Sequence, residues 1–128
     1  MSRTPLTIGR DQPMSEAHRL MRTHVIRHLP VLHGGRLVGL VSDRDLHLVE
    51  TLRDVDPQKV TVEEAMSPEP YVVTPEQPID AVVAAMAERK LGSAVVMRDR
   101  EVLGIFTTID ALHAFAAVLR TQREKEVR

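Results

Sequence analysis

Two aspartates, each three residues after a hydroxyl side chain, are the residues of this chain best suited to bind a ligand. The first ends the segment Gly39–Asp45 (GLVSDRD), and the pattern returns sixty-five positions later in Gly104–Asp110 (GIFTTID). An ionised carboxylate only accepts hydrogen bonds, so either aspartate can take two parallel charge-assisted bonds from a vicinal diol. Arg44 could point a guanidinium at a phosphate, whereas Ile109 stands at the matching position of the second copy. We therefore expect two sites of unequal affinity.

The same residues also admit a structural interpretation. Apolar, β-branched runs precede both segments and helical apolar patterns follow them, so each should be a strand that turns into a helix. Such a junction exposes unpaired N–H groups and the positive end of a helix dipole, which attract anions. Ser42 with Asp45, and Thr107 with Asp110, also match a capping box worth about 1 kcal/mol without any ligand. Asp45→Ala should separate the interpretations by abolishing a nucleotide-induced thermal shift at little cost to the unliganded protein.

Other chemistry finds little support in the sequence. His24 and His28 have the i, i+4 spacing of a metal pair, but a helix is expected to end between them, so we predict no metal site. Nucleophile elbows, Walker loops and paired nucleophile and base are absent, and the chain has no cysteine, so we predict no catalytic residues and no enzyme. The net charge of −1 and the three aromatic residues argue against nucleic-acid binding. With no apolar run long enough to span a membrane and no signal-peptide pattern, we expect a cytoplasmic protein.

The elements that must position these residues form an ungapped internal repeat. A shift of sixty-five positions aligns Gln12-Pro13 with Gln77-Pro78, Met21 with Met86 and Val31 with Val96. Each copy predicts a short strand, an amphipathic helix with proline in its first turn, a β hairpin and a second helix. The expected elements of the first copy are a strand at 6–8, a helix with Met14, Ala17 and Met21 on one face, strands at 29–32 and 37–41, and a helix over 44–53. Those of the second copy are a strand at 71–74, a helix with Ile79, Val82, Val83 and Met86 on one face, strands at 94–97 and 102–106, and a helix over 109–122.

The fold class that follows is α/β (α+β): two β-α-β-β-α units related by a pseudo-two-fold axis. We divide the chain into a first repeat (1–56), a linker (57–65) and a second repeat with a charged tail (66–128). A capping box at Thr61 predicts a short helical turn within the linker. The alanine-rich segments 81–87 and 111–119 are apolar around most of a helix, which predicts a homodimer built on them.

The doubled Gly-apolar-apolar-Ser/Thr-x-x-Asp motif, set in this order of elements, resembles a tandem cystathionine β-synthase (CBS) domain pair over essentially the whole chain. The resemblance implies a globular module that binds AMP, ADP, ATP, S-adenosylmethionine or a dinucleotide in clefts between the repeats. It also implies that each site is shared between the repeats. One repeat supplies the aspartate, which holds the ribose hydroxyls, and the Ser/Thr, which reaches the phosphate, while the other repeat supplies the residues around the adenine. One site would combine Ser42, Arg44 and Asp45 with Tyr71, Val72, Leu91, Gly92 and Ser93; the other would combine Thr107 and Asp110 with Leu6, Thr7, Ile26, Arg27 and His28.

The expected function is therefore a regulatory, ligand-sensing module for an adenine nucleotide, with no required cofactor. An effector protein, which the sequence does not identify, would read the bound state. Two alternatives stay open: a sensor of S-adenosylmethionine or NAD, and a structural dimerisation or protein-interaction module whose clefts hold no ligand.

Overall fold

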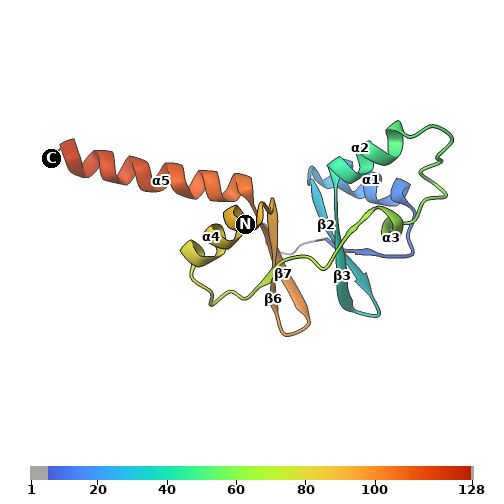
Figure 1. Ribbon diagram of the computed structural model, residues 1–128, viewed down its shortest axis with the longest axis horizontal. Coiled ribbons are helices and arrows are strands. Elements are labelled where there is room, and N and C mark those ends of the chain that lie inside the picture. The colour runs from blue at the N-terminus through green and yellow to red at the C-terminus, as the bar shows by residue number, and fades with distance from the viewer. Residues whose placement is uncertain (1–5, 128) are drawn as a thin grey trace.

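The computed structural model describes residues 6–127 and shows a mixed α/β chain that repeats one order of elements (Figure 1). The first repeat holds β1 (Ile8–Gly9), α1 (Met14–His24), β2 (His28–His33), β3 (Arg36–Ser42) and α2 (Asp43–Thr51). A connection with α3 (Val62–Ala65) and β4 (Ser67–Pro68) leads to the second repeat, which holds β5 (Val72–Val73), α4 (Ile79–Arg89), β6 (Ser93–Arg98), β7 (Glu101–Thr107) and α5 (Thr108–Val127). The predicted β-α-β-β-α order is confirmed in both copies.

The two hairpins pair in the same register. His28 on β2 lies opposite Ser42 on β3, and Ser93 on β6 lies opposite Thr107 on β7. Both hairpins also slip at the same place, between Val31 and Leu32 in one and between Val96 and Met97 in the other. Each motif hydroxyl therefore stands at the end of its strand, directly before a helix.

The first strand of each repeat pairs in parallel with the second in the same register, but the ladder begins one position later in the first repeat. In the second repeat the ladder begins where Val72 faces Val95, and the Val95 amide donates to the Tyr71 carbonyl at 2.8 Å. In the first repeat Pro30 occupies the position of Val95 and has no N–H to donate. The ladder of β1 accordingly begins only at Ile8, opposite Val31.

Each repeat has its own hydrophobic core. The predicted stripe of α1 is confirmed, because Met14, Ala17 and Met21 are all buried. In α4 only Val82 and Met86 are buried, and the prediction is wrong for Ile79, which is 55% exposed. Ile79 begins its helix and is neither a member of the second core cluster nor among the described residues packed against it. The two buried clusters share no residue, so each repeat is stabilised mainly from within.

The connection packs on the first repeat. Val62 of α3 is fully buried in the first core, and β4 pairs antiparallel with Gly39 and Leu40 of β3. The predicted helical turn before Met66 is confirmed, but the capping box is not, since the Thr61 side chain makes no capping hydrogen bond. Segments divided by sequence into a linker and the start of repeat two therefore complete the sheet and core of repeat one.

Helix α5 runs five residues beyond its predicted end at residue 122 and extends away from the body of the second repeat (Figure 1). Its counterpart α2 ends at Thr51, so the repeats differ most in their last helices. Among the described residues, no helix combines the length and hydropathy that crossing a bilayer would demand.

Candidate functional site

Asp45 closes a complete capping box at the start of α2. Its Oδ2 accepts hydrogen bonds from the Ser42 amide at 2.8 Å and from the Ser42 hydroxyl at 3.0 Å. In return, the Asp45 amide donates to Ser42 Oγ at 3.3 Å. The structural interpretation of this motif is thus confirmed, although the Oδ1 atom of Asp45 accepts no hydrogen bond from any described residue.

The second motif has almost the same geometry. Asp110 Oδ2 accepts from the Thr107 amide at 2.9 Å and from its hydroxyl at 3.1 Å, and the Asp110 amide donates to Thr107 Oγ1 at 3.2 Å. In both motifs the hydroxyl hydrogen is directed at the aspartate. To reach a phosphate, Ser42 or Thr107 would have to give up that bond.

A backbone hydrogen bond joins the start of each of these helices to the loop before the second strand of its own repeat. The Asp43 amide donates to the Arg27 carbonyl at 3.0 Å, and the Thr108 amide donates to the Gly92 carbonyl at 3.0 Å. The Thr108 hydroxyl reinforces the second contact at 3.2 Å. The candidate segments 26–28 and 91–93 are therefore hydrogen-bonded to the motif of the same repeat, and their crossed contribution to the other site stays a prediction.

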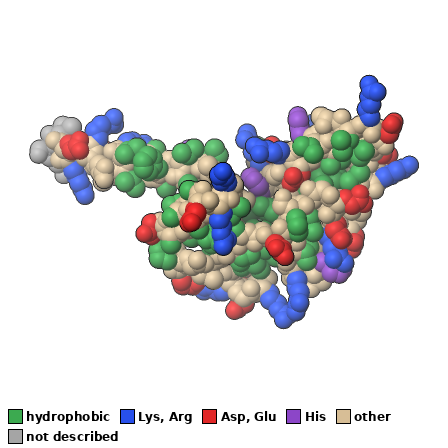
Figure 2. Space-filling view, viewed as in Figure 1, with side chains coloured by type: hydrophobic (Ala, Val, Ile, Leu, Met, Phe, Trp, Pro, Cys, Tyr) green, Lys and Arg blue, Asp and Glu red, His purple; other side chains and the backbone are tan. Residues whose placement is uncertain are grey.

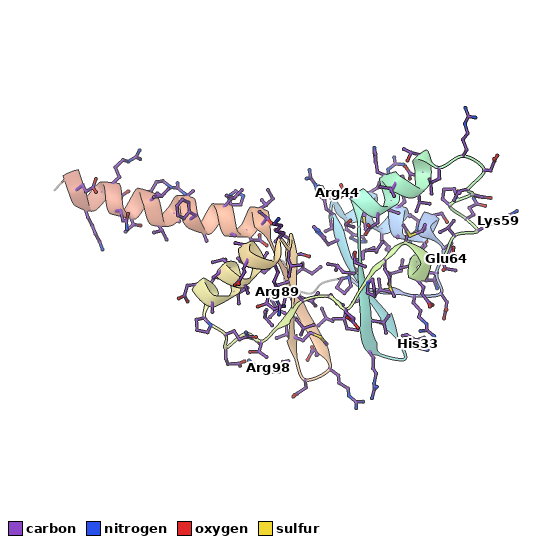
Figure 3. The ribbon with its side chains drawn as sticks, in the orientation of Figure 1. His33, Arg44, Lys59, Glu64, Arg89 and Arg98 are labelled. Carbon is purple, nitrogen blue, oxygen red and sulfur yellow. The ribbon has the colours of Figure 1, made fainter. Side chains whose placement is uncertain are left out.

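The two motifs face one another across the molecule. Helices α2 and α5 both begin between the repeats and run away from each other, and Arg44 lies at the end of α2 nearest the second repeat (Figures 1 and 3). We call this region, bounded by the starts of α2, α5, β2 and β6, the seam.

His28 is the residue that links the repeats electrostatically. Burial lowers its pKa from the ordinary 6.5, and Arg27 acts in the same direction, while the carboxylates of Asp43, Asp45 and Asp110 oppose the shift. Since Asp110 belongs to the second repeat, its carboxylate acts on the pKa of His28 from across the seam, and a joint role of the two residues in the second site stays a prediction. A neutral imidazole at this position can both donate and accept a hydrogen bond.

The remaining candidates divide into packed and accessible residues. Leu6 and Ile26 pack on the first core, and Tyr71 and Leu91 on the second, so each has a structural role. The Arg89 guanidinium carbon lies 5.2 Å from the centre of the Tyr71 ring, a cation–π contact that sequence reasoning missed. The residues Arg27, Arg44, Val72 and Gly92 are exposed, and Thr7 and Ser93 are half-buried.

Two grooves lined by described residues lie away from the motif aspartates. One crosses α1 and α2 beside His18 and Glu50; the other lies between the hairpin ends, beside Arg36 and Arg100, and touches the candidate set only at Val72. His24 ends α1 and His28 begins β2, so this pair does not share a helix face. No cluster of three potential metal ligands occurs within residues 6–127.

Two β-α-β-β-α units, each ending in a capped helix at a shared seam, define a class of tandem-repeat α/β modules. The profile of the CBS domain matches residues 1–49 and 62–117, and the chain belongs to that family as a tandem CBS-domain pair.

Relatives of known identity agree with this assignment. The chain is 31% identical over 124 residues to inosine-5'-monophosphate dehydrogenase of Korarchaeum cryptofilum. The aligned region covers 96% of this chain but only 25% of that enzyme. Its fold matches the CBS-domain pair of protein MJ0100, solved with 5'-methylthioadenosine and S-adenosyl-L-methionine, with a TM-score of 0.80, 28% identity and coverage of 91% and 92% of the two chains. It also matches a hexameric CBS-CP12 protein from bloom-forming cyanobacteria with a TM-score of 0.76 and 27% identity, over 88% of this chain and 66% of that one.

Proposed function

We propose that this chain is a regulatory module that binds an adenosine-containing ligand at the seam, and that it is not an enzyme. One observation carries the proposal: Asp45 caps its helix with Oδ2 and leaves Oδ1 without a hydrogen bond from the described residues. The cap holds the carboxylate in one orientation, so Oδ1 is a preorganised acceptor for a ribose diol. The ligands bound by MJ0100, a relative of similar fold, support the same class of ligand.

The charges at the seam suggest which adenosyl ligands fit. Asp43, Asp45 and Asp110 all act on His28, whereas Arg27 and Arg44 are the candidate cations there. Among the described residues, the carboxylates of Asp43 and Asp45 beside the Arg44 guanidinium disfavour a triphosphate without a bound cation. A monophosphate such as AMP, or a ligand with a cationic group such as S-adenosylmethionine, matches these charges better. Arg44 would contact the phosphate, since the Ser42 hydroxyl already donates its hydrogen bond to Asp45.

Signalling would follow from closure of the seam. Because the two cores are separate, a ligand held by both repeats can change how the repeats sit against each other. An effector protein that prefers the closed arrangement would then bind better in the presence of the ligand, and by linkage would tighten the binding of that ligand.

Isothermal titration calorimetry of the purified chain against AMP, ATP, S-adenosylmethionine, 5'-methylthioadenosine and NAD tests the proposal. We expect at least one adenosyl ligand to bind, with AMP or S-adenosylmethionine tighter than ATP. Arg44→Gln should weaken AMP much more than 5'-methylthioadenosine, which has no phosphate. Adenosine-free controls such as ribose 5-phosphate should not bind.

The complete capping boxes favour a second candidate, a dimerisation or protein-interaction module whose seam binds no ligand. A cap explains both Ser/Thr and Asp in each motif by helix stability alone. This candidate prevails if none of the five compounds binds while the chain self-associates. Self-association through α4 and α5 belongs to both candidates.

A further inference from the structure

The groove between the ends of the two hairpins combines apolar side chains with charges of both signs. Its volume is about 410 Å³, which lies within the range of small-molecule sites. Leu37, Pro70 and Met97 line it and are half-buried, and Val72 beside them is 43% exposed. The remaining lining residues are exposed and charged: Arg36, Glu69, Asp99 and Arg100. An apolar surface with a charged rim is the composition expected of a binding site.

This groove lies at the opposite end of the hairpins from the two capping motifs. Arg36 begins β3 and Ser42 ends it, so the two residues are about 20 Å apart along the strand. Likewise, Arg100 stands directly before β7, and Thr107 ends that strand. Figure 2 shows basic side chains, drawn blue, at the lower edge of the molecule, where Figure 1 places the turns of both hairpins. The groove is therefore separate from the seam and shares with its candidate residues only Val72.

The four charged side chains of the groove have no partner within the described part of the chain. None of them forms an ion pair or a side-chain hydrogen bond with another described residue, although the neighbouring Arg98 is paired with Glu76 at 2.6 Å. Arg36 comes from the first repeat and Asp99 and Arg100 from the second, so the two repeats present both signs of charge to one space. A ligand that itself carries both signs can match these charges.

Both carboxylates of the groove stand on left-handed backbone, which is uncommon outside glycine and especially so for glutamate. The angle φ is +53° at Glu69 and +55° at Asp99. In the first repeat, Gly34, with a φ of +57°, occupies the position of Asp99, and Gly35 occupies that of Arg100. Two glycines therefore suffice to build this turn, and the second repeat has a carboxylate and a guanidinium in their place. Because strained backbone clusters at functional sites, these charges point to binding and not to folding.

We propose that this groove binds a free amino acid with an apolar side chain. The carboxylate of the ligand would lie between Arg36 and Arg100, since a guanidinium group can donate two parallel hydrogen bonds to a carboxylate. The ammonium group of the ligand would face Glu69 and Asp99, and its side chain would lie on the half-buried apolar surface. A compound with only one of the two charges leaves part of the rim unmatched. The proposal does not rest on ligand binding at the seam.

An amide NMR titration of the isotope-labelled chain with L-leucine tests the site, because the Kd expected for so small a ligand is on the order of 1 mM. We expect shifts of the amide signals at residues 34–36, 98–100 and Val72. N-acetyl-L-leucine lacks the ammonium group, L-leucinamide lacks the carboxylate and glycine lacks the apolar side chain, so each should bind at least about tenfold more weakly. Unchanged amide signals at these positions up to about 20 mM L-leucine would overturn the proposal, and so would equal binding of N-acetyl-L-leucine, which would show a site for any anion.

Variants at the rim assign the binding to this groove, and their exposed positions leave the fold intact, as circular dichroism can check. Arg36→Gln and Arg100→Gln should each weaken L-leucine about tenfold or more. The matched control is Arg98→Gln, which removes a guanidinium from the same hairpin but outside the groove, and it should bind L-leucine as wild type does. Unchanged affinity in both groove variants, or an equal loss in Arg98→Gln, would refute the assignment. Asp45→Asn should keep the affinity for L-leucine, so the outcome here is independent of the outcome at the seam.

Discussion

Replacing Asp45 by asparagine should separate its two roles, helix cap and ligand acceptor. An asparagine carbonyl can still accept from the Ser42 amide, which now lies 2.8 Å from Asp45 Oδ2, so the cap persists. The position that offers Oδ1 to a ligand would then hold an NH₂ group, which donates instead of accepting. Asp45→Ala is a poorer test than the sequence suggested, because it also leaves the half-buried Ser42 amide unsatisfied, at a cost of about 1–2 kcal/mol.

The expected ligand-induced stabilisation of the folded chain follows from linkage between binding and folding. A ligand at one hundred times its Kd stabilises the folded chain by about 2.7 kcal/mol, which is roughly 10 °C in Tm for a domain of this size. Loss of a hydrogen bond to a charged group costs about 1.5–3 kcal/mol, so Kd should rise roughly 10- to 100-fold. At the same ligand concentration, the stabilisation then falls to about 0.4–1.4 kcal/mol.

Differential scanning fluorimetry with the tightest ligand from the calorimetric panel measures this change. The matched control is Asp43→Asn, which removes the same charge from the same helix end but lies outside the capping box. We expect Asp43→Asn to keep most of the ligand-induced shift and Asp45→Asn to lose most of it, with similar Tm values for both unliganded variants. If Asp45→Asn retains the full shift, Asp45 is a helix cap only and the ligand binds elsewhere.

Three further perturbations test the structure at other points. In urea unfolding, Gly39→Ala should destabilise the chain by about 1–3 kcal/mol, because a Cβ there would clash with the Met66 side chain and lie 3.0 Å from the Ser67 carbonyl oxygen. The control Gly9→Ala should be neutral, because the nearest atom to its added Cβ lies at 3.7 Å. His28 has a pKa below 6.5 in the folded chain, so the unfolded chain binds more protons as the pH falls through that value. The stability that neutral His28 contributes is fully present above about pH 6.5 and is lost below it. Tm measured from about pH 7.5 to 5 should therefore decline less in His28→Gln than in wild type. Val62→Ala should cost about 2–3 kcal/mol in the same unfolding assay, because the side chain is fully buried; an unchanged midpoint would show that α3 does not stabilise the first repeat.

The sequence predicted the fold well because the two periods in it are strong and repeated. The stripe of Met14, Ala17 and Met21 has the helical period, and the apolar runs that precede Ser42 and Thr107 mark buried strands. The capping residues follow those runs at once, so the start of each last helix was predicted to within a residue. Local chemistry decides such features, and local chemistry is visible in a sequence.

Features that depend on distant segments were predicted less well. Burial of Ile79 would require another segment to pack over the start of α4. The helical spacing of Ile79 cannot show that this residue stays outside the core cluster. The contact of Arg89 with Tyr71 joins residues eighteen positions apart without any local pattern. Gly39 of the repeated motif faces Met66 and Ser67 of the connection, a contact that the spacing of the motif does not indicate. Each case depends on which segment folds over which, and residue spacing does not encode that.

Pro30 gives the two repeats different local stability. Without an amide hydrogen at this position, β1 lacks the bond that Val95 makes to Tyr71 in the second repeat. Segments held by fewer hydrogen bonds open at lower free energy, so the outer strand of the first sheet should detach before that of the second. In native-state hydrogen exchange, the Arg10 amide, bonded to Leu32, should therefore lose its protection sooner than the Val95 amide. Detachment would uncover an unpaired edge on β2, and such an edge can accept a strand from another molecule.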